Sequence, residues 1–144
     1  MTVLAAVVTG LLAAAVVETP AVVVQAPDSP VKLDRATVVT VAGSPPVLLY
    51  GATNLTDTEL DQFTVIVFVF NAQGTLKARQ TAPARRTLDP RGTKHSTIVL
   101  DGSPIEPTDL IVVGVNQAQR VNSDVWWRAE LQTAAEAAAQ PRKP

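Results

Sequence analysis

The stretch FTVIVFVF, residues 63–70, limits the possible folds of this chain more than any other feature. It is β-branched and aromatic, and the turn residues NAQG follow it directly. Eight residues with this many valines are too few for a core helix, so we predict a buried strand. Side chains alternate along a strand, which places Phe63 and three valines on one face and Thr64, Ile66, Phe68 and Phe70 on the other. Because both faces are apolar, we predict a central strand covered on one side by a core and on the other by a terminal segment or a partner.

Short segments with strand character lie on both sides of this stretch and are separated by turn signals such as Pro45-Pro46, LDPRG and DGSP. Gly114 is expected to mark a β-bulge in the longest of them. The predicted strands are residues 35–43, 47–54, 75–82, 93–100, 109–121 and 125–131. This spacing predicts an all-β fold, an antiparallel immunoglobulin-like β-sandwich of about seven strands over residues 35–131.

Both ends of the chain differ in composition from this middle part. Residues 2–17 carry no charge, and their length suits the apolar core of a signal peptide better than a membrane span, although no Lys or Arg precedes them. We therefore predict a signal peptide in residues 1–21, then a Pro-rich linker over 22–34; a β-rich N-terminal arm is the alternative. Residues 132–144 are Ala-rich and predict a partly ordered helical tail that gains little from docking.

Residues 48–100 resemble the FxLYD-type immunoglobulin-like domains of exported bacterial and archaeal proteins. Gly51 and Asn54 match the end of one strand of that pattern, and Gly74 matches its glycine turn. Leu88, Pro90 and Gly92 match a later turn, with Arg91 inserted before the glycine. Val67, Phe70 and Asn71 stand where the pattern commonly has Phe, Tyr and Asp. The resemblance implies an accessory, adhesive or spacer module, and it brings no catalytic residues to this chain.

Charge and cysteine content exclude several classes of function. The formal net charge is -1, which gives no electrostatic basis for binding nucleic acid. There is no cysteine, so thiolate nucleophiles, disulfides and zinc–thiolate sites are absent. We expect no cofactor.

A cluster of basic residues in residues 76–94 is the first candidate for binding a partner. Lys77, Arg79, Arg85, Arg86, Arg91 and Lys94 lie there with Asp89 as the single acid. A hairpin would place several of them on one face, where they could meet an acidic protein or an anionic surface polymer. The alternative is that these charges keep a sheet edge from pairing with other chains.

Adjacent tryptophans supply the second candidate. Trp126 and Trp127 point to opposite faces of a strand, so one should enter the core and the other should be exposed or covered by a terminus. An exposed tryptophan can anchor a partner or a sugar ring. The candidate partner-binding residues are therefore Arg79, Arg85, Arg86, Trp126 and Trp127.

Residues that could carry out catalysis or hold a metal are few. His95 is the only histidine, and we interpret it as a surface residue because no nucleophile motif accompanies it. Asp57, Glu59 and Asp61 offer oxygens to a calcium ion but lack an EF-hand pattern, so we expect a solvated loop and no metal site. The sequence NLT at residues 54–56 matches a glycosylation signal by chance.

The sequence as a whole predicts a non-enzymatic, exported interaction or structural module in the periplasm, at the cell surface or secreted. The alternative is a self-assembling surface or fibre subunit that adds its Val-rich N-terminus as a strand to a neighbour, which leaves oligomerisation open. No stable membrane span is expected after processing. A small hydrolase or metal-dependent enzyme is the third interpretation, and the scarcity of candidate residues argues against it.

Overall fold

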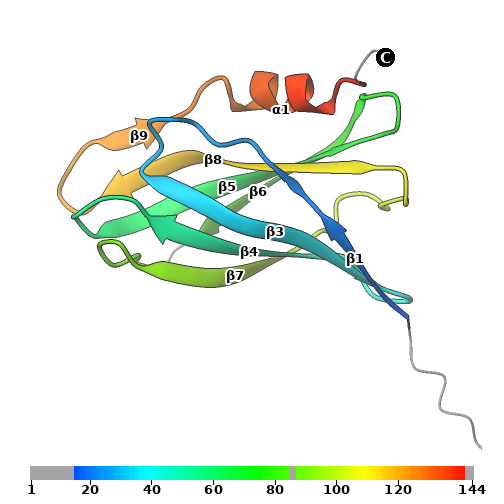
Figure 1. Ribbon diagram of the computed structural model, residues 1–144, viewed down its shortest axis with the longest axis horizontal. Coiled ribbons are helices and arrows are strands. Elements are labelled where there is room, and N and C mark those ends of the chain that lie inside the picture. The colour runs from blue at the N-terminus through cyan, green and yellow to red at the C-terminus, as the bar shows by residue number, and fades with distance from the viewer. Residues whose placement is uncertain (1–14, 85–86, 142–144) are drawn as a thin grey trace, which may run out of the picture.

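Two β-sheets pack face to face, and one helix lies on the outer side of the second sheet (Figure 1). This computed structural model describes residues 15–84 and 87–141. Sheet A has the strand order β1-β3-β4-β7, with bounds Val16–Pro20, Val31–Val41, Val47–Asn54 and Thr93–Val99. Sheet B has the order β2-β8-β5-β6, with bounds Val22–Val23, Leu110–Arg120, Leu60–Phe70 and Leu76–Ala84; β9, Val125–Trp127, also pairs with β8. The predicted all-β sandwich is confirmed at this level.

The pairing is mostly antiparallel, but sheet B is mixed because β2 runs parallel to β8. The immunoglobulin-like topology is not confirmed. In an immunoglobulin constant-type domain the strands A, B, E and D form one sheet and C, F and G form the other. The consecutive strands β3 and β4 are neighbours in sheet A, as A and B are in that arrangement, whereas the parallel pairing of β2 with β8 has no counterpart in its two antiparallel sheets.

The N-terminal part of the described chain belongs to the sandwich. Strand β1 pairs with β3 at the edge of sheet A, and β2 then joins sheet B, so this segment crosses from one sheet to the other. The range 22–34, expected to be a Pro-rich linker, contains β2 and the first residues of β3, and Ala26, Ser29 and Val31 are buried. Residues 1–14 lie outside the described residues, so the signal peptide stays a prediction.

Strand β5 occupies the centre of sheet B, as its two apolar faces predict. Its inward side chains join the core between the sheets, which includes Val65, Val67, Leu48 and Ile98. Its outward side chains form a second cluster with the helix α1, Leu131–Ala139, which contains Ile66, Phe68, Phe70, Val112, Leu131, Ala135 and Ala139. A terminal segment therefore covers the outer face. We expected the Ala-rich tail to gain little from docking, yet one face of the helix is buried against the sheet through one leucine and two alanines.

Gly114 has a different role from the one predicted. It lies in register opposite Ile66, and the ladder shifts between Thr64 and Val65 instead, leaving Asn116 as the extra residue on β8. A Cβ on Gly114 would lie 2.5 Å from Leu131 Cδ1 and 3.2 Å from the carbonyl oxygen of Val24. The glycine is therefore required where α1 and the segment after β2 approach the sheet closely. Strand β9 also ends earlier than predicted, since Leu131 begins the helix.

Asn54, one of the residues that match the FxLYD pattern, forms several hydrogen bonds that connect loops. It is fully buried, and its amide donates hydrogen bonds to the carbonyl oxygens of Thr58 at 2.8 Å and Leu88 at 3.0 Å. Its side-chain oxygen accepts from the amide and the hydroxyl of Thr56. These bonds fasten the β4–β5 loop to the turn before β7, so the match to a glycosylation signal is coincidental.

Candidate functional site

The two tryptophans of β9 point in opposite directions, as predicted. Trp126 lies opposite the buried Ala118, packs against the core and donates a hydrogen bond of 3.1 Å from Nε1 to Asp28. Trp127 lies opposite Gln117 on the outer face of sheet B and is 63% exposed. Trp127 is therefore the side chain available to a partner, and Trp126 is structural.

A groove of about 420 Å³ lies beside Trp127, where helix α1 begins. We call it the Trp127 groove; its lining includes Ile66, Arg79, Asn116, Trp127, Arg128 and Gln132. The residues come from four strands and the helix, because β9, β8, β5 and β6 run side by side in sheet B and α1 lies over the sheet. The structure thus brings together Arg79 and Trp127, two of the five candidate residues.

Arg79 is held in place without an acidic partner among the described residues. Its guanidinium carbon lies 5.8 Å from the centre of the Phe68 ring, a distance at which a cation is attracted to the ring. One of its terminal nitrogens donates a hydrogen bond of 3.2 Å to Gln132 Oε1 on the helix. The side chain is exposed, so its remaining donors face solvent.

The second arginine of the groove has a structural role. Arg128 donates from Nε to Glu130 at 3.0 Å and from a terminal nitrogen to the carbonyl oxygen of Val24 at 2.7 Å. Its side chain is only 9% exposed. It therefore ties the connection between β9 and α1 to the segment after β2 and offers little charge to a ligand.

The other basic residues of the predicted cluster are separated. Lys77 forms an ion pair of 2.5 Å with Asp109, whose side chain is 1% exposed. Arg91 pairs with the exposed Asp57, and Lys94 donates to the carbonyl oxygen of Thr87. Arg85 and Arg86 lie outside the described residues. A shared basic face is therefore not seen in the part of the cluster that the structure describes.

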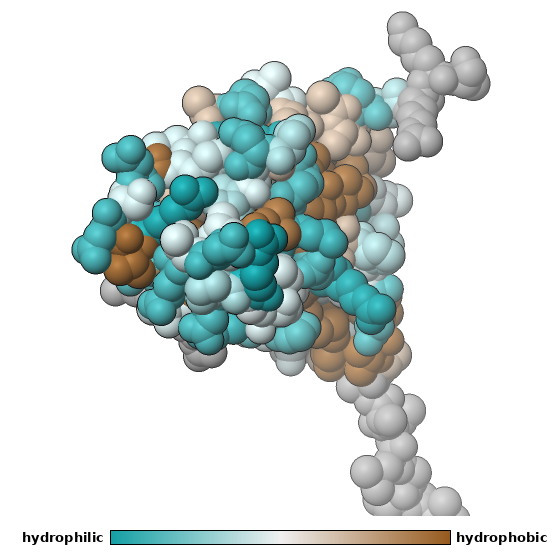
Figure 2. Space-filling model, turned by 60° about the vertical axis from the view of Figure 1, so that its left-hand side comes forward, coloured by the Kyte–Doolittle hydropathy of each residue, from teal (hydrophilic) through white to brown (hydrophobic). Residues whose placement is uncertain are grey.

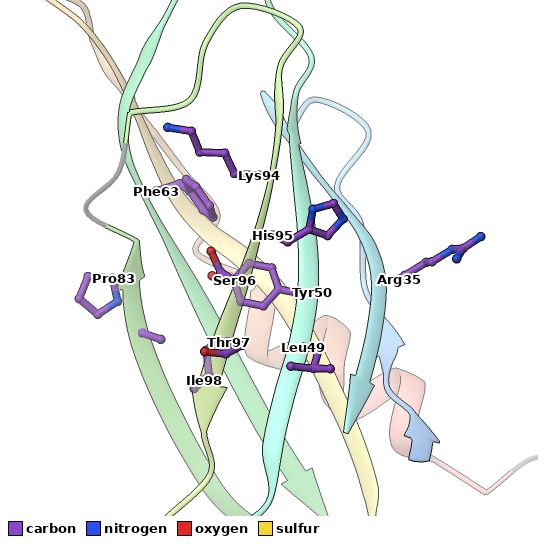
Figure 3. A pocket seen from close by; sticks show the side chains of 11 residues that line it. Arg35, Leu49, Tyr50, Phe63, Pro83, Lys94, His95, Ser96, Thr97 and Ile98 are labelled. Atoms are coloured by element: carbon purple, nitrogen blue, oxygen red, sulfur yellow. The ribbon is translucent and has the colours of Figure 1, made fainter. Parts of the chain in front are cut away.

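A larger opening of about 540 Å³ lies where the sheets part, between the edge strands β6 and β7 (Figure 3). It wraps around β7: Lys94 and Phe63 lie on one side of sheet A, whereas His95 and Arg35 extend to the other. Burial raises the pKa of Tyr50 in its wall, and the nearby Ser96 hydroxyl opposes part of that rise. The opening brings no second aromatic platform to the surface, because Tyr50 and Phe63 are buried.

His95 is exposed, as interpreted from the sequence. It does not form a catalytic Ser–His pair with the adjacent Ser96. The two residues are consecutive on β7 and face opposite sides of sheet A. Across the strands His95 lies in a row with Gly51 and Asp34. The Thr53 hydroxyl donates a bond of 2.6 Å to Asp34 and lowers the pKa of that carboxyl, and Lys32 lowers it further.

No cluster of three or more metal-binding side chains occurs among the described residues. The acidic loop that could have offered oxygens to calcium has Asp57 paired with Arg91 at 2.9 Å, and Glu59 and Asp61 are exposed. Within the same residues, no helix combines the length and the hydrophobicity that crossing a membrane requires.

Sequence reasoning found Arg79 and Trp127 but missed the residues between them. Asn116, Arg128 and Gln132 belong to no motif, and their place in the groove depends on the bulge in β8 and on the docking of α1. The sequence matches no known family model and no curated protein.

Proposed function

We propose that this protein is a non-catalytic, exported binding module that contacts its partner through the Trp127 groove. The observation that carries the proposal is the 63% exposure of Trp127 beside an arginine that lacks an acidic partner among the described residues. Large exposed aromatic residues are costly in water and are enriched at binding surfaces, as is arginine. The apolar N-terminal residues 2–17 support export.

The relationship to FxLYD-type domains remains part of this proposal. Asn54 and Leu88, which match the family pattern, are joined by a buried hydrogen bond, so these matches describe turns and packing. The matched residues thus support the scaffold, and the proposed binding residues lie elsewhere. This division is consistent with an accessory or adhesive role.

Cysteine labelling tests the proposal cleanly because the chain contains no cysteine. Thr81→Cys places a thiol on the outer face of sheet B, opposite Ile66 and near Arg79, and Thr97→Cys is the matched control on the outer face of sheet A. Both positions are exposed and should react at similar rates with a membrane-impermeant maleimide in the purified protein. In intact cells we expect position 97 to react and position 81 to be protected several-fold.

Two results would count against the proposal, each against a different part. If position 97 reacts only after the cells are broken, the protein is not exported to an accessible compartment. If positions 81 and 97 react equally in intact cells, the face around Trp127 is unoccupied and the binding surface is wrongly assigned.

Self-assembly is a second candidate function, favoured by strand β1. All five of its residues are exposed, and among the described residues no strand pairs with its outer edge. The edge strand β6 carries two charges, Lys77 and Arg79, within its length, whereas β1 carries one charge, Glu18, and its proline, Pro20, lies at its end. Val16 and Val17 are 59% and 56% exposed, and hydrophobic surface gathers near the start of β1 (Figure 2).

Light scattering at increasing concentration tests this second candidate. The expected result is a rise in mass that Val17→Lys abolishes, because a charge on the edge prevents strand addition. A wild-type protein that stays monomeric at high concentration would exclude self-assembly through β1.

A further inference from the structure

The open half of the outer face of sheet B has an unusual combination of side chains. A row across the strands carries Trp127, Gln117, Thr64 and Pro83, and the next row carries Val125, Gln119 and Gln62. Asn116 and Thr81 lie close by at the bulge and on β6. Amide and hydroxyl side chains are therefore the commonest type around a single exposed aromatic ring.

This composition favours a ligand rich in hydroxyl groups over a protein surface. Amides and hydroxyls both donate and accept hydrogen bonds, so they match sugar hydroxyls, which do the same. The centre of a protein interface is apolar and excludes water. Within the described residues of β5, β6, β8 and β9, Trp127 is the one large hydrophobic residue that is exposed, and Val121 directly after β8 is 45% exposed. The flat indole ring can pack against the C–H face of a sugar ring.

The charge of the groove points to an acidic sugar. The charge of Arg128 is neutralised by Glu130, whereas Arg79 has no acidic partner within residues 15–84 and 87–141. The Phe68 ring and Gln132 hold the Arg79 guanidinium in position before any ligand arrives. A planar guanidinium with free donors binds a carboxylate through paired hydrogen bonds.

We propose that the Trp127 groove binds an acidic glycan, with one sugar ring packed on Trp127 and the carboxylate of a uronic acid unit bound by Arg79. The inference rests on the proposed function and adds the chemical class of the ligand to it. The amides of Gln117 and Asn116 receive the hydroxyl groups of the same sugar. A groove of about 420 Å³ has room for one or two sugar units.

Isothermal titration calorimetry of the full chain with trigalacturonate tests this inference. Its methyl ester, which has the same rings without the negative charges, is the matched neutral ligand, and a glutamate-rich peptide is the matched acidic polymer. We expect trigalacturonate to bind with a dissociation constant of about 1 mM or tighter. Trp127→Ala should abolish detectable binding, and Arg79→Gln should weaken it about tenfold.

Arg91→Gln is the control variant, because it removes the same charge from an exposed arginine that pairs with Asp57 on a distant loop. It should leave binding unchanged. Equal binding of the methyl ester would overturn the acidic glycan, as would binding that Trp127→Ala does not alter. A failure of every ligand, or binding of the peptide alone, would also overturn it, while the labelling at position 81 would still decide the proposed function independently.

Discussion

The outer face of sheet B is divided into two halves with opposite properties. In one half, Phe68, Phe70 and Val112 are completely buried beneath helix α1. In the other half, beyond Leu131 at the start of the helix, most side chains are amides and hydroxyls, and Trp127 is exposed among them. The same two strands, β5 and β8, run through both halves.

The difference between the halves follows from residue type along these strands. Strand β5 places Phe68 and Phe70 outward at one end and Thr64 and Gln62 outward at the other. An exposed aromatic pair would be unfavourable, whereas an exposed threonine or glutamine is not. The helix therefore covers only the apolar half, and the polar half remains available to bind a ligand.

The largest effect is expected from removing the residue that anchors the cover. Leu131 is 2% exposed and packs on the apolar half, so Leu131→Ala should lower the free energy of unfolding by about 3 kcal/mol. It should also increase binding of a hydrophobic dye, because Phe68 and Phe70 become accessible. Urea denaturation and dye fluorescence measure the two effects.

Thr133→Ala is the control for this variant. Thr133 is exposed on the same helix, so its truncation should change stability by less than about 0.5 kcal/mol. Equal effects of the two substitutions would mean that the helix does not stabilise the sandwich by covering the sheet.

The next effect should come from preventing the close approach of the helix. Gly114→Ala adds a methyl group 2.5 Å from Leu131 Cδ1, so the helix or the segment around Val24 must move. We expect a loss of about 2 kcal/mol in urea denaturation. Gly102→Ala, where a methyl group meets nothing within 4 Å, should be nearly neutral; a similar loss in both variants would contradict the packing role of Gly114.

Periodicity along the chain predicted the apolar half well. The alternation of apolar residues in β5 identified a central strand with two covered faces, and the Ala-rich tail identified a helix. The docking of that helix was not predicted, because small methyl groups suggested little gain. The close approach that Gly114 allows makes the contact tight, and such a contact between distant segments is not encoded in either segment alone.

The polar half was harder to predict for a related reason. Alternation along β9 predicted that one tryptophan would face outward, but could not decide which. That choice depends on the register of β9 against β8, which sets Trp126 opposite the buried Ala118. The separation of the basic residues depends likewise on partners distant in sequence, such as Asp109 for Lys77.

A pair of matched truncations in β9 separates the structural tryptophan from the one that we propose binds a partner. Trp126→Ala removes core packing and the bond to Asp28, so it should lower the free energy of unfolding by about 2 kcal/mol. Trp127→Ala should change it by less than about 0.5 kcal/mol, because the ring is largely exposed. Chemical denaturation of both variants measures the difference, and a larger loss for Trp127 would reverse their assigned roles.

The smallest effect is expected on the outer face of sheet A, which serves as a reference for the polar half of sheet B. The pKa of Asp34 is lowered in the folded protein, first by the hydrogen bond from Thr53 and then by Lys32. A carboxyl with a lowered folded pKa contributes stability above its unfolded pKa of about 4 and loses it as the pH falls through the folded value. Because the Asp34 side chain is one-third exposed, we expect this contribution to the free energy of unfolding to be at most about 0.5 kcal/mol.

Thr53→Val should remove most of this contribution at neutral pH, so the stability of the variant should fall less than that of the wild type between about pH 5 and pH 2. Parallel stability curves for the two proteins would show that Asp34 is not coupled to folding. Thr53→Val should not affect the Trp127 groove, since Asp34 and Trp127 lie on the outer faces of different sheets.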